Sequence, residues 1–253
     1  MRIDRDGGVL VLTLDRPERL NAMNGAQWSA LLEGLRTAED DPEIRAVVIR
    51  GEGRIFCAGN DIKETSAFAG KAEARAYFLD LMVPALAAMA TSRLPIVGSA
   101  HGMALGAGFE LLQFCDVVVA ADTCSFRLPE TRIGLWATVF LGSASYSANR
   151  RGTQWLALTG EPMSAQEAEA AHFVSRVVPE ASLEEETMRV ARTIASRGPN
   201  ATAVSKRFAN YSLVNEGLKV VREALSELID DTLWSDEGVE GVAAFTEKRD
   251  PVF

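Results

Sequence analysis

In this chain of 253 residues, the side chains best suited to acid–base catalysis belong to two glutamates. Glu110 lies in the apolar run GFELLQFC, where an ionised carboxylate is costly unless it has a partner or a function. Glu130 follows a proline in SFRLPETRIG and precedes a glycine, a loop setting from which a side chain can be directed. Together they could serve as a general acid and a general base. Taken singly, Glu130 is better explained as structural, whereas Glu110 is equally consistent with either role.

Two glycine-containing segments could leave backbone N–H groups free to bind an oxygen atom. In IFCAGNDIKE a strand-like run breaks at Ala58–Gly59, where glycine permits a sharp turn. In IVGSAHGMALGAGFELLQFCD a buried strand leads through Gly102, Gly106 and Gly108 into a helix, whose start exposes N–H groups and a partial positive charge. Two such turns converging on one point would form an oxyanion hole. An ordinary strand-to-helix turn is the alternative explanation of the first segment.

Competing motifs fail on spacing. The glycines at 106 and 108 are followed by Phe109 where a dinucleotide-binding fingerprint requires a further glycine, and the sequence has neither a phosphate-binding GKS or GKT loop nor a G-x-S-x-G elbow. The three cysteines, Cys57, Cys115 and Cys124, lack metal-type spacing and favour free thiols in a reducing compartment. We therefore expect no metal site and no catalytic cysteine.

The segments that must position these groups alternate between strand and helix in the first half of the chain. Residues 9–15 alternate in polarity and residues 46–51 are β-branched, so both are predicted strands, and residues 27–39 between them have helical spacing. Residues 95–100 and 117–121 are short β-branched runs whose continuous apolarity predicts strands buried on both faces. The pattern predicts an α/β fold.

Helical patterns dominate after residue 152. A turn at 160–162 separates two helical patterns, and Ser164 with Glu167 has capping-box spacing. Further helical periodicity follows over 182–196, 200–214, 216–234 and 236–248, with a break at 198–199. We therefore expect an α/β core over 1–195 and a helical region over 196–253 that could mediate oligomerisation.

The composition is that of a folded protein with an acidic balance. Apolar residues make up 47% and charged residues 24%, and the formal net charge is −9, which argues against a nucleic-acid partner. No secretory signal pattern follows the opening MRIDRDGG, and the apolar stretches are too short to span a bilayer. We expect no membrane partner and a cytoplasmic location.

Taken together, these segments resemble the crotonase family, the enoyl-CoA hydratases and isomerases, across almost the whole chain. The resemblance rests on four motifs in the right order, LDRPERLNAM, FCAGNDIKE, HGMALGAGFEL and FTEKRDPVF. It implies a crotonase-like spiral of repeated ββα units with a C-terminal helical region. It also implies an acyl-CoA thioester substrate, no cofactor apart from the coenzyme A of that substrate, and a homotrimer or a dimer of trimers.

The resemblance also implies roles for individual residues. The N–H groups of Asn60 and Ala107 match the family's two oxyanion donors, neither depending on its side chain, and Glu110 and Glu130 match the two glutamates of hydratases. The implied substrate-binding residues are Ala58, Asp61, Ile62, Lys63, Gly106, Gly108, Trp136, Phe245 and Lys248. Taken alone, the last two are typical of an ordinary helix with a core phenylalanine and a solvated lysine.

The sequence departs from the family pattern after Glu130. There TRIGLWATVFLGSASYS replaces a loop rich in glycine and proline, and Trp136 and Phe140 could narrow or reshape the acyl pocket. His101 stands where asparagine is frequent and is best explained as a packed neutral histidine.

The implied reaction is hydration of a trans-2-enoyl-CoA, with Glu110 activating water and Glu130 exchanging the proton at the α-carbon. The alternatives are an enoyl-CoA isomerase that uses Glu130 as a single base, and a lyase or hydrolase for a specialised acyl group. An RNA-binding protein or an assembly scaffold is disfavoured by the acidic charge and by the paired glutamates.

Overall fold

Strands and helices alternate along the chain in the computed structural model, which describes residues 1–144 and 150–253. The strands are β1 (Arg2–Asp6), β2 (Val9–Leu14), β3 (Ala46–Gly51), β4 (Ile96–Ala100), β5 (Met103–Leu105), β6 (Val117–Ala121), β7 (Ser125–Arg127), β8 (Met163–Ser164) and β9 (Arg176–Val178). The helices are α1 (Gly25–Asp40), α2 (Ile62–Thr65), α3 (Lys71–Tyr77), α4 (Val83–Thr91), α5 (Ala107–Leu112), α6 (Thr138–Ala144), α7 (Arg150–Thr159), α8 (Ala165–Ala170), α9 (Leu183–Ala195), α10 (Pro199–Ala209), α11 (Leu218–Glu227) and α12 (Asp236–Glu247). Residues 145–147, which end the segment predicted to depart from the family pattern, lie outside the described residues.

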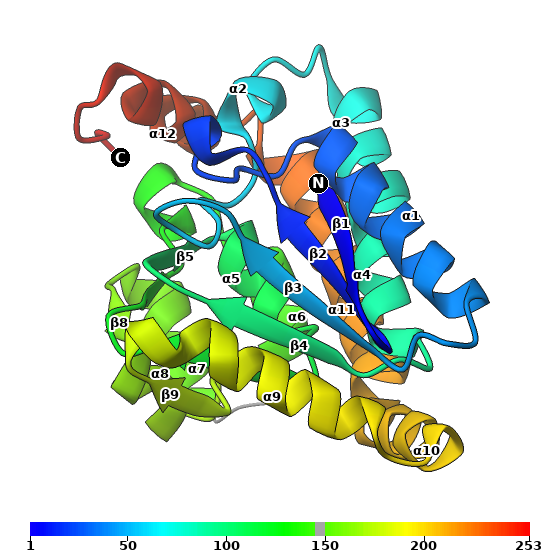
Figure 1. Cartoon of the computed structure of the whole chain (residues 1–253). Helices are drawn as coiled ribbons and strands as arrows, with labels where there is room; N and C mark the ends of the chain where they lie inside the picture. The colour runs from blue at the N-terminus through cyan, green and yellow to red at the C-terminus, as the bar shows by residue number, and fades with distance from the viewer. Residues whose placement is uncertain (145–149) are drawn as a thin grey trace.

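Two sheets organise the described part of the chain (Figure 1). Six strands form the larger sheet in the order β1-β2-β3-β4-β6-β9, with β1 antiparallel to β2 and the other neighbours parallel. The smaller sheet has the order β5-β7-β8, and Cys57 adds an isolated bridge to Ala104 of β5. The chain therefore runs repeatedly from the larger sheet to the smaller one and back through helices.

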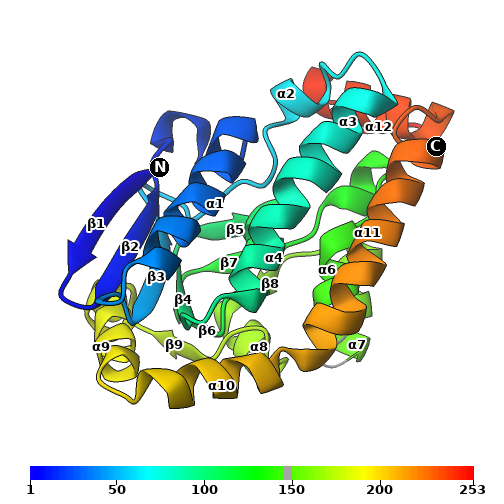
Figure 2. The same ribbon diagram turned by 90° about the vertical axis from the view of Figure 1, so that its right-hand side faces the viewer.

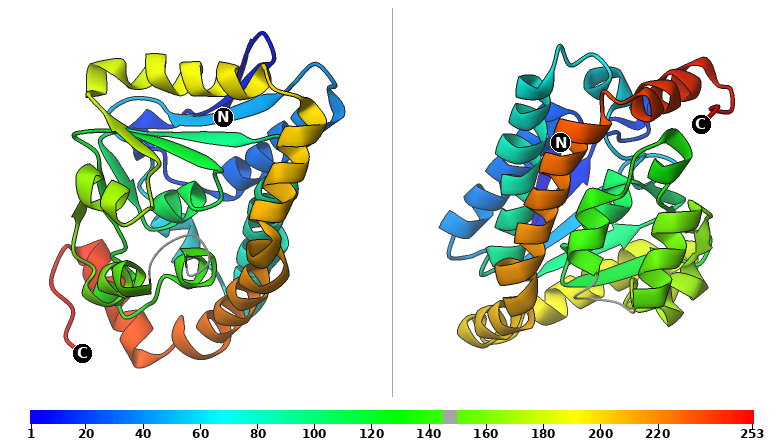
Figure 3. Two further views of the ribbon diagram at one scale, coloured as in Figure 1. Left: turned by 90° about the horizontal axis from the view of Figure 1, so that it is seen from below. Right: turned by 180° about the vertical axis from the view of Figure 1, so that it is seen from behind.

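The four strands predicted from the sequence are confirmed as β2, β3, β4 and β6. Helices cover both faces of the sheet that they form: α9 contacts β3 and β4 on one face, and α1 contacts β2 on the other (Figure 3). Burial on both faces explains the continuous apolarity of β4 and β6. Figure 2 shows α11 running beside α4 and α6, with both of which it is in contact.

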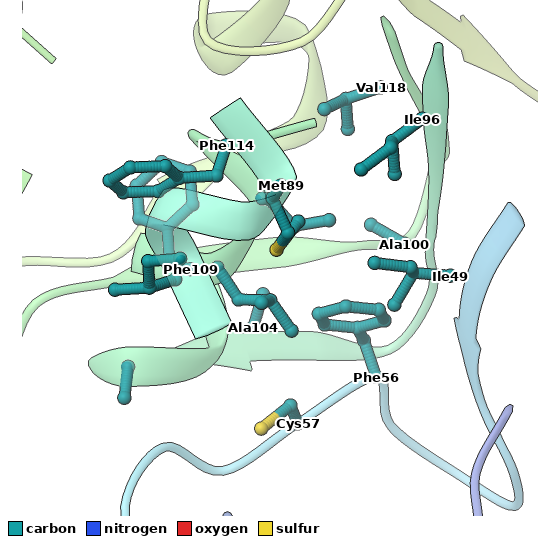
Figure 4. Packing of buried hydrophobic residues seen from close by; sticks show 14 of the residues in the cluster. Ile49, Phe56, Cys57, Met89, Ile96, Ala100, Ala104, Phe109, Phe114 and Val118 are labelled. Carbon is teal, nitrogen blue, oxygen red and sulfur yellow. The ribbon is translucent and has the colours of Figure 1, made fainter. Parts of the chain in front are cut away.

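A hydrophobic core fills the space between the larger sheet and the helices on the α1 side. Figure 4 shows Phe56 and Met89 packed among side chains of β3 and β4, with Phe109 of α5 close by. The ring of Phe109 lies 4.9 Å from that of Phe126 and 5.1 Å from that of Phe140, measured between centroids. This aromatic packing fixes α5, the helix that carries Glu110.

A buried ion pair attaches the C-terminal helical region to the α/β core. The ammonium group of Lys206 in α10 lies 2.8 Å from the carboxylate of Asp116 and donates to the carbonyl oxygen of Leu94 at 2.8 Å. Asn210 adds hydrogen bonds to Ala90 O and to Asp116. The predicted helical character of residues 196–253 is confirmed, whereas their role in oligomerisation stays a prediction.

None of the helices in the described ranges is at once long enough and apolar enough to cross a membrane.

Replacing Lys206 with methionine should destabilise the fold, because it leaves the half-buried carboxylate of Asp116 without its cation. Breaking a buried ion pair costs about 3 kcal/mol of unfolding free energy. Lys219→Met is the matched control, since Lys219 is exposed and lies 3.9 Å from the exposed Glu223. Denaturant unfolding of both variants measures the difference. Equal unfolding free energies in the two variants would show that the ion pair does not hold α10 in place.

Candidate active site

The main-chain N–H of Asn60 is directed by the glycine before it. Gly59 has φ 94°, a conformation that glycine adopts readily and other residues rarely adopt. Its carbonyl oxygen accepts a hydrogen bond from the N–H of Met23 at 2.8 Å. Because the Gly59–Asn60 peptide is trans, the N–H of Asn60 points away from Met23, on the opposite side of the peptide plane.

The main-chain N–H of Ala107 is directed by a second glycine. Gly106 has φ 47°, and its carbonyl oxygen accepts from the N–H of Glu110 at 2.9 Å in the first turn of α5. Ala107 is the first residue of this helix, so its N–H has no partner inside the helix and points out from the N-terminus.

The two N–H groups meet at one cavity. A Cβ atom placed on Gly59 would lie 3.4 Å from the nitrogen of Ala107, so the two turns are in close contact. Asn60 and Ala107 both line a cavity of about 500 Å³, and across residues 1–144 and 150–253 neither N–H donates to another protein group. Donors placed in this way can bind a single oxygen atom.

Glu110 points into the same cavity from α5. Only 6% of the residue is exposed, and its Oε1 accepts from the N–H of Phe140 at 2.9 Å, in the first turn of α6. Burial raises the pKa of this carboxyl, while hydrogen bonding from the N–H groups of Phe140 and Val139 opposes the rise because it favours the ionised form.

Glu130 enters the cavity from the other side. It begins a 3₁₀ turn, Glu130–Ile133, which ends at Gly134 with φ 65°. A Cβ atom on Gly106 would lie 2.7 Å from Oε1 of Glu130, so this carboxyl packs directly against the second glycine turn. Its Oε2 is shielded from solvent and has no hydrogen-bond partner in the described part of the chain. Burial, and then the charge of Glu110, raise the pKa of Glu130.

The two glutamates differ in which protonation state their surroundings favour. Glu110 accepts from the start of α6, which stabilises its carboxylate, whereas Glu130 has an unpartnered buried oxygen beside that carboxylate. Repulsion between two buried negative charges disfavours double ionisation, so the pair retains a proton above the ordinary glutamate range. Glu130 is the better site for that proton. The cavity thus holds two carboxyl groups that can act as a base and an acid, next to two N–H groups that can bind an oxygen atom.

The rest of the cavity wall is mainly apolar and comes from segments far apart in the sequence. Its large side chains are Phe68, Phe78, Met82, Leu135, Trp136, Leu225, Leu228, Leu233, Trp234, Val239, Val242 and Phe245. No group of three or more His, Cys, Asp or Glu side chains in the described residues could hold a metal ion.

Helix α12 closes the cavity and packs closely on the turn that carries Glu130. A Cβ atom on Gly241 of α12 would lie 2.0 Å from the carbonyl oxygen of Ile133, which leaves room only for glycine. Gly134 in turn packs against the backbone of Glu237. Figure 1 shows α12 near α2.

Most residues predicted for the site line this cavity. They are Ala58, Asn60, Ile62, Gly106, Ala107, Glu110, Glu130, Trp136 and Phe245. Four others, Asp61, Lys63, Gly108 and Lys248, are not among the lining residues. Lys63 and Lys248 are exposed.

Asp61 and Gly108 instead support the site from behind. The carboxylate of Asp61 pairs with the guanidinium of Arg16 at 3.1 Å, and this ion pair is largely removed from solvent. Gly108 packs so closely on Cys57 that a Cβ atom would lie 2.6 Å from the carbonyl oxygen of Cys57. Both residues therefore shape the glycine turns rather than contact the cavity.

Neither Cys57 nor His101 lines the cavity. Burial raises the pKa of the Cys57 thiol to about 12, which suits a packed side chain rather than a nucleophile. Nε2 of His101 lies 2.8 Å from the carbonyl oxygen of Gly53.

Proteins named as enoyl-CoA hydratases are similar to the chain over its whole length. A sequence model described as enoyl-CoA hydratase/isomerase matches residues 4–253. A probable enoyl-CoA hydratase of Mycobacterium tuberculosis is 35% identical over 257 residues, covering 99% of this chain and 96% of that protein. The human protein named enoyl-CoA hydratase domain-containing protein 3, mitochondrial, is 32% identical over 249 residues, covering 97% of this chain and 80% of that protein.

Solved structures confirm the predicted fold. The enoyl-CoA hydratase/isomerase from Pseudoalteromonas atlantica T6c has a TM-score of 0.89 and 31% identity, covering 100% of this chain and 98% of that one. A putative enoyl-CoA hydratase from Mycobacterium avium paratuberculosis K-10 has a TM-score of 0.85 and 28% identity, covering 99% and 98%. The α/β architecture is therefore the crotonase-like one that the sequence motifs implied.

The buried glutamates should make the folded state less stable as the pH rises. Because both pKa values are raised, the folded protein holds protons that the unfolded chain releases, so the unfolding free energy falls as the pH rises from the ordinary glutamate pKa to the raised values, and levels off above them. Glu130→Gln removes one of these charges, and we expect it to be about 1 to 2 kcal/mol more stable than the wild type at pH 8. Denaturant unfolding from pH 5 to 9 tests this, with the exposed Glu161→Gln as the control. A variant with the same slope as the wild type would contradict the assignment.

Proposed function

The chain belongs to the enoyl-CoA hydratase/isomerase family, and from this premise we propose that it adds water across the 2,3 double bond of a trans-2-enoyl-CoA. One observation carries the choice of hydration: the cavity holds Glu110, which is buried, and Glu130, whose Oε2 is shielded from solvent, and their surroundings favour opposite protonation states. Hydration needs a base for water and an acid for carbon at the same time, whereas moving a double bond needs a single carboxylate.

The N–H groups of Asn60 and Ala107 bind the thioester oxygen in this proposal. When water attacks C3, negative charge moves through C2 to that oxygen, and both donors already point at it. Their fixed geometry supports the proposal, since Gly59 O and Gly106 O are each held by a hydrogen bond on the other side of the same peptide unit. Donors that need no reorganisation favour the enolate over the ground-state carbonyl.

The glutamates then move two protons. The Glu110 carboxylate takes a proton from the attacking water, whose oxygen bonds to C3, and neutral Glu130 gives its proton to C2. The product is a 3-hydroxyacyl-CoA, and the enzyme is left with its proton on Glu110. Returning that proton to Glu130, directly or through water, restores the starting state. The reaction needs no cofactor apart from the coenzyme A of the substrate.

The remaining expectations from the sequence stay predictions. A homotrimer or dimer of trimers is to be tested by light scattering, and a cytoplasmic location by fractionation of the source cells. Phe245 lines the cavity and Lys248 follows at the end of α12, an arrangement compatible with an approach of this helix to the coenzyme A part of the substrate.

Removing either glutamate should abolish most of the activity without abolishing binding. We expect Glu110→Gln and Glu130→Gln each to lower kcat for crotonyl-CoA hydration by about 10² to 10⁴. Butyryl-CoA, whose acyl chain has no carbon–carbon double bond, should still bind both variants in calorimetric titration. Glu161→Gln, at an exposed position outside the cavity, should keep wild-type kcat. Full activity in either cavity variant would exclude the proposed mechanism.

The pH profile of hydration should be bell-shaped and centred above the ordinary glutamate range. The rate rises as Glu110 ionises through its raised pKa, and falls as Glu130 loses its proton through its own. The reverse reaction, dehydration of the 3-hydroxyacyl-CoA, also requires one proton in total on Glu110 and Glu130. Its pH profile should therefore coincide with that of hydration. Measurements of kcat/KM in both directions from pH 5 to 10 test this. A flat profile would contradict the assignment of the acid and the base.

Incubation in heavy water separates hydration from isomerisation. Mass analysis should find a 3-hydroxyacyl-CoA when a 2-enoyl ester is supplied. Interconversion of 2-enoyl and 3-enoyl esters without a hydroxylated product would replace the hydratase assignment by that of an isomerase.

A further inference from the structure

The side-chain oxygen of Asn60 lies within hydrogen-bonding distance of two aromatic residues. Nε1 of Trp28, in α1, lies 3.2 Å from Oδ1 of Asn60, and the hydroxyl oxygen of Tyr77, in α3, lies 3.0 Å from the same atom. The two aromatic groups are also 3.2 Å apart, from Trp28 Nε1 to the Tyr77 hydroxyl. Both residues are buried, with 1% and 5% of their surface exposed. We call Trp28, Tyr77 and Asn60 the amide clamp.

The chemistry of the indole ring fixes the orientation of the Asn60 amide. An indole N–H can only donate, so the group facing Trp28 must be the oxygen of the Asn60 side chain and not its NH₂. The hydroxyl of Tyr77 accepts from Trp28 and has one hydrogen of its own, for which Asn60 Oδ1 and the carbonyl oxygen of Met23 compete. Its contact with Met23 O is the shorter, at 2.7 Å.

Met23 connects this network to the main chain of the first oxyanion turn. Its N–H donates to Gly59 O at 2.8 Å, and its carbonyl oxygen accepts from the N–H of Asp61 at 2.8 Å. These two hydrogen bonds engage the residues on either side of Asn60, namely Gly59 and Asp61. Tyr77 therefore contacts both Met23, which orients the peptide unit before Asn60, and the side chain of Asn60 itself.

We propose that Trp28 and Tyr77 are positioning residues for the first oxyanion donor: they hold the Asn60 side chain and the Met23 carbonyl so that the main-chain N–H of Asn60 stays aimed at the thioester oxygen. The inference rests on the proposed function, in which that N–H binds the carbonyl. It also alters the expectation that the side chain at position 60 is irrelevant to catalysis.

The surroundings of Tyr77 suit a positioning role. Its ring lies 5.4 Å from that of Phe68 and 5.0 Å from that of Phe78, between centroids, and both phenylalanines line the cavity. These contacts fix the ring without involving the hydroxyl. The hydroxyl accepts from Trp28 and gives its single hydrogen to Met23 O or to Asn60 Oδ1, so removing it alone tests the clamp while leaving the packing in place.

The first experiment is Tyr77→Phe, with Tyr211→Phe as the matched control because Tyr211 is exposed and lies outside the cavity. We expect Tyr77→Phe to lower kcat about tenfold, since small misplacements of a catalytic donor have large effects on rate, while KM changes less than about twofold. The control should match the wild type in both. Trp28→Phe removes the other donor and should lower kcat in the same direction.

A spectroscopic measurement separates positioning from general loosening of the fold. The C=O stretching band of bound butyryl-CoA shifts to lower frequency when the oxyanion donors polarise it. We expect this shift to be smaller in Tyr77→Phe than in the wild type at saturating ligand, and unchanged in Tyr211→Phe. Asn60→Ala should reduce the shift as well, and adding Tyr77→Phe to it should lower kcat by less than Tyr77→Phe does alone, because part of the clamp is already broken.

The outcomes distinguish this inference from the proposed function. An unchanged carbonyl shift and unchanged kcat in both Tyr77→Phe and Trp28→Phe would overturn the clamp while leaving the hydratase proposal standing. A wild-type protein that does not hydrate enoyl-CoA, but whose carbonyl shift is reduced in Tyr77→Phe, would overturn the hydratase proposal and support the clamp.

Discussion

Repulsion between two carboxylates that are both largely removed from solvent is the constraint on which the arrangement of this site depends. Glu110 and Glu130 cannot both be ionised there at low cost, so the surroundings must favour one charge and one proton. The start of α6 supplies the donors that favour the charge on Glu110. The 3₁₀ turn places Glu130 where one of its oxygens has no partner. Each glutamate thus depends on a different element. By holding both elements in place, the core also determines that the proton resides on Glu130.

The oxyanion donors depend on a second constraint, the orientation of two peptide units. In each, the carbonyl oxygen is engaged within the fold, by Met23 for Gly59 and by the helical N–H of Glu110 for Gly106. The N–H on the other side of the peptide plane is thereby directed into the cavity without any side chain at the donor position having to contact the substrate. The parallel bridge between Cys57 and Ala104 of β5 brings the two turns together, because Gly59 and Gly106 each follow two residues after the bridged pair.

The sequence was most informative where a local pattern determines the structure. Strands β2, β3, β4 and β6, the capping box at Ser164 and the helical C-terminal region were all predicted correctly from periodicity and capping residues. Strands β5, β7, β8 and β9 were not, because two or three residues are too short for a period to be visible.

The same distinction holds for the site. Glu110 was recognisable because a carboxylate in an apolar helix needs an explanation, and Gly59 and Gly106 because sharp turns need glycine. The cavity wall from α11 and the contribution of Trp28 and Tyr77 were not recognisable, because helical periodicity gives the apolar face of a helix but not the segment that it meets. The family resemblance implied binding roles for Asp61 and Gly108, but the carboxylate of Asp61 pairs with Arg16 and the backbone of Gly108 packs on Cys57.

The close packing of Gly241 on Ile133 has a consequence for biosynthesis. The turn that begins with Glu130 is supported by α12, which follows it much later in the chain. During translation the sheet, both glycine turns and both glutamates emerge from the ribosome well before this helix does. A nascent chain can thus assemble its α/β core while the cavity is still open on one side, and the carboxyl group of Glu130 reaches its final setting only after α12 has packed on its turn.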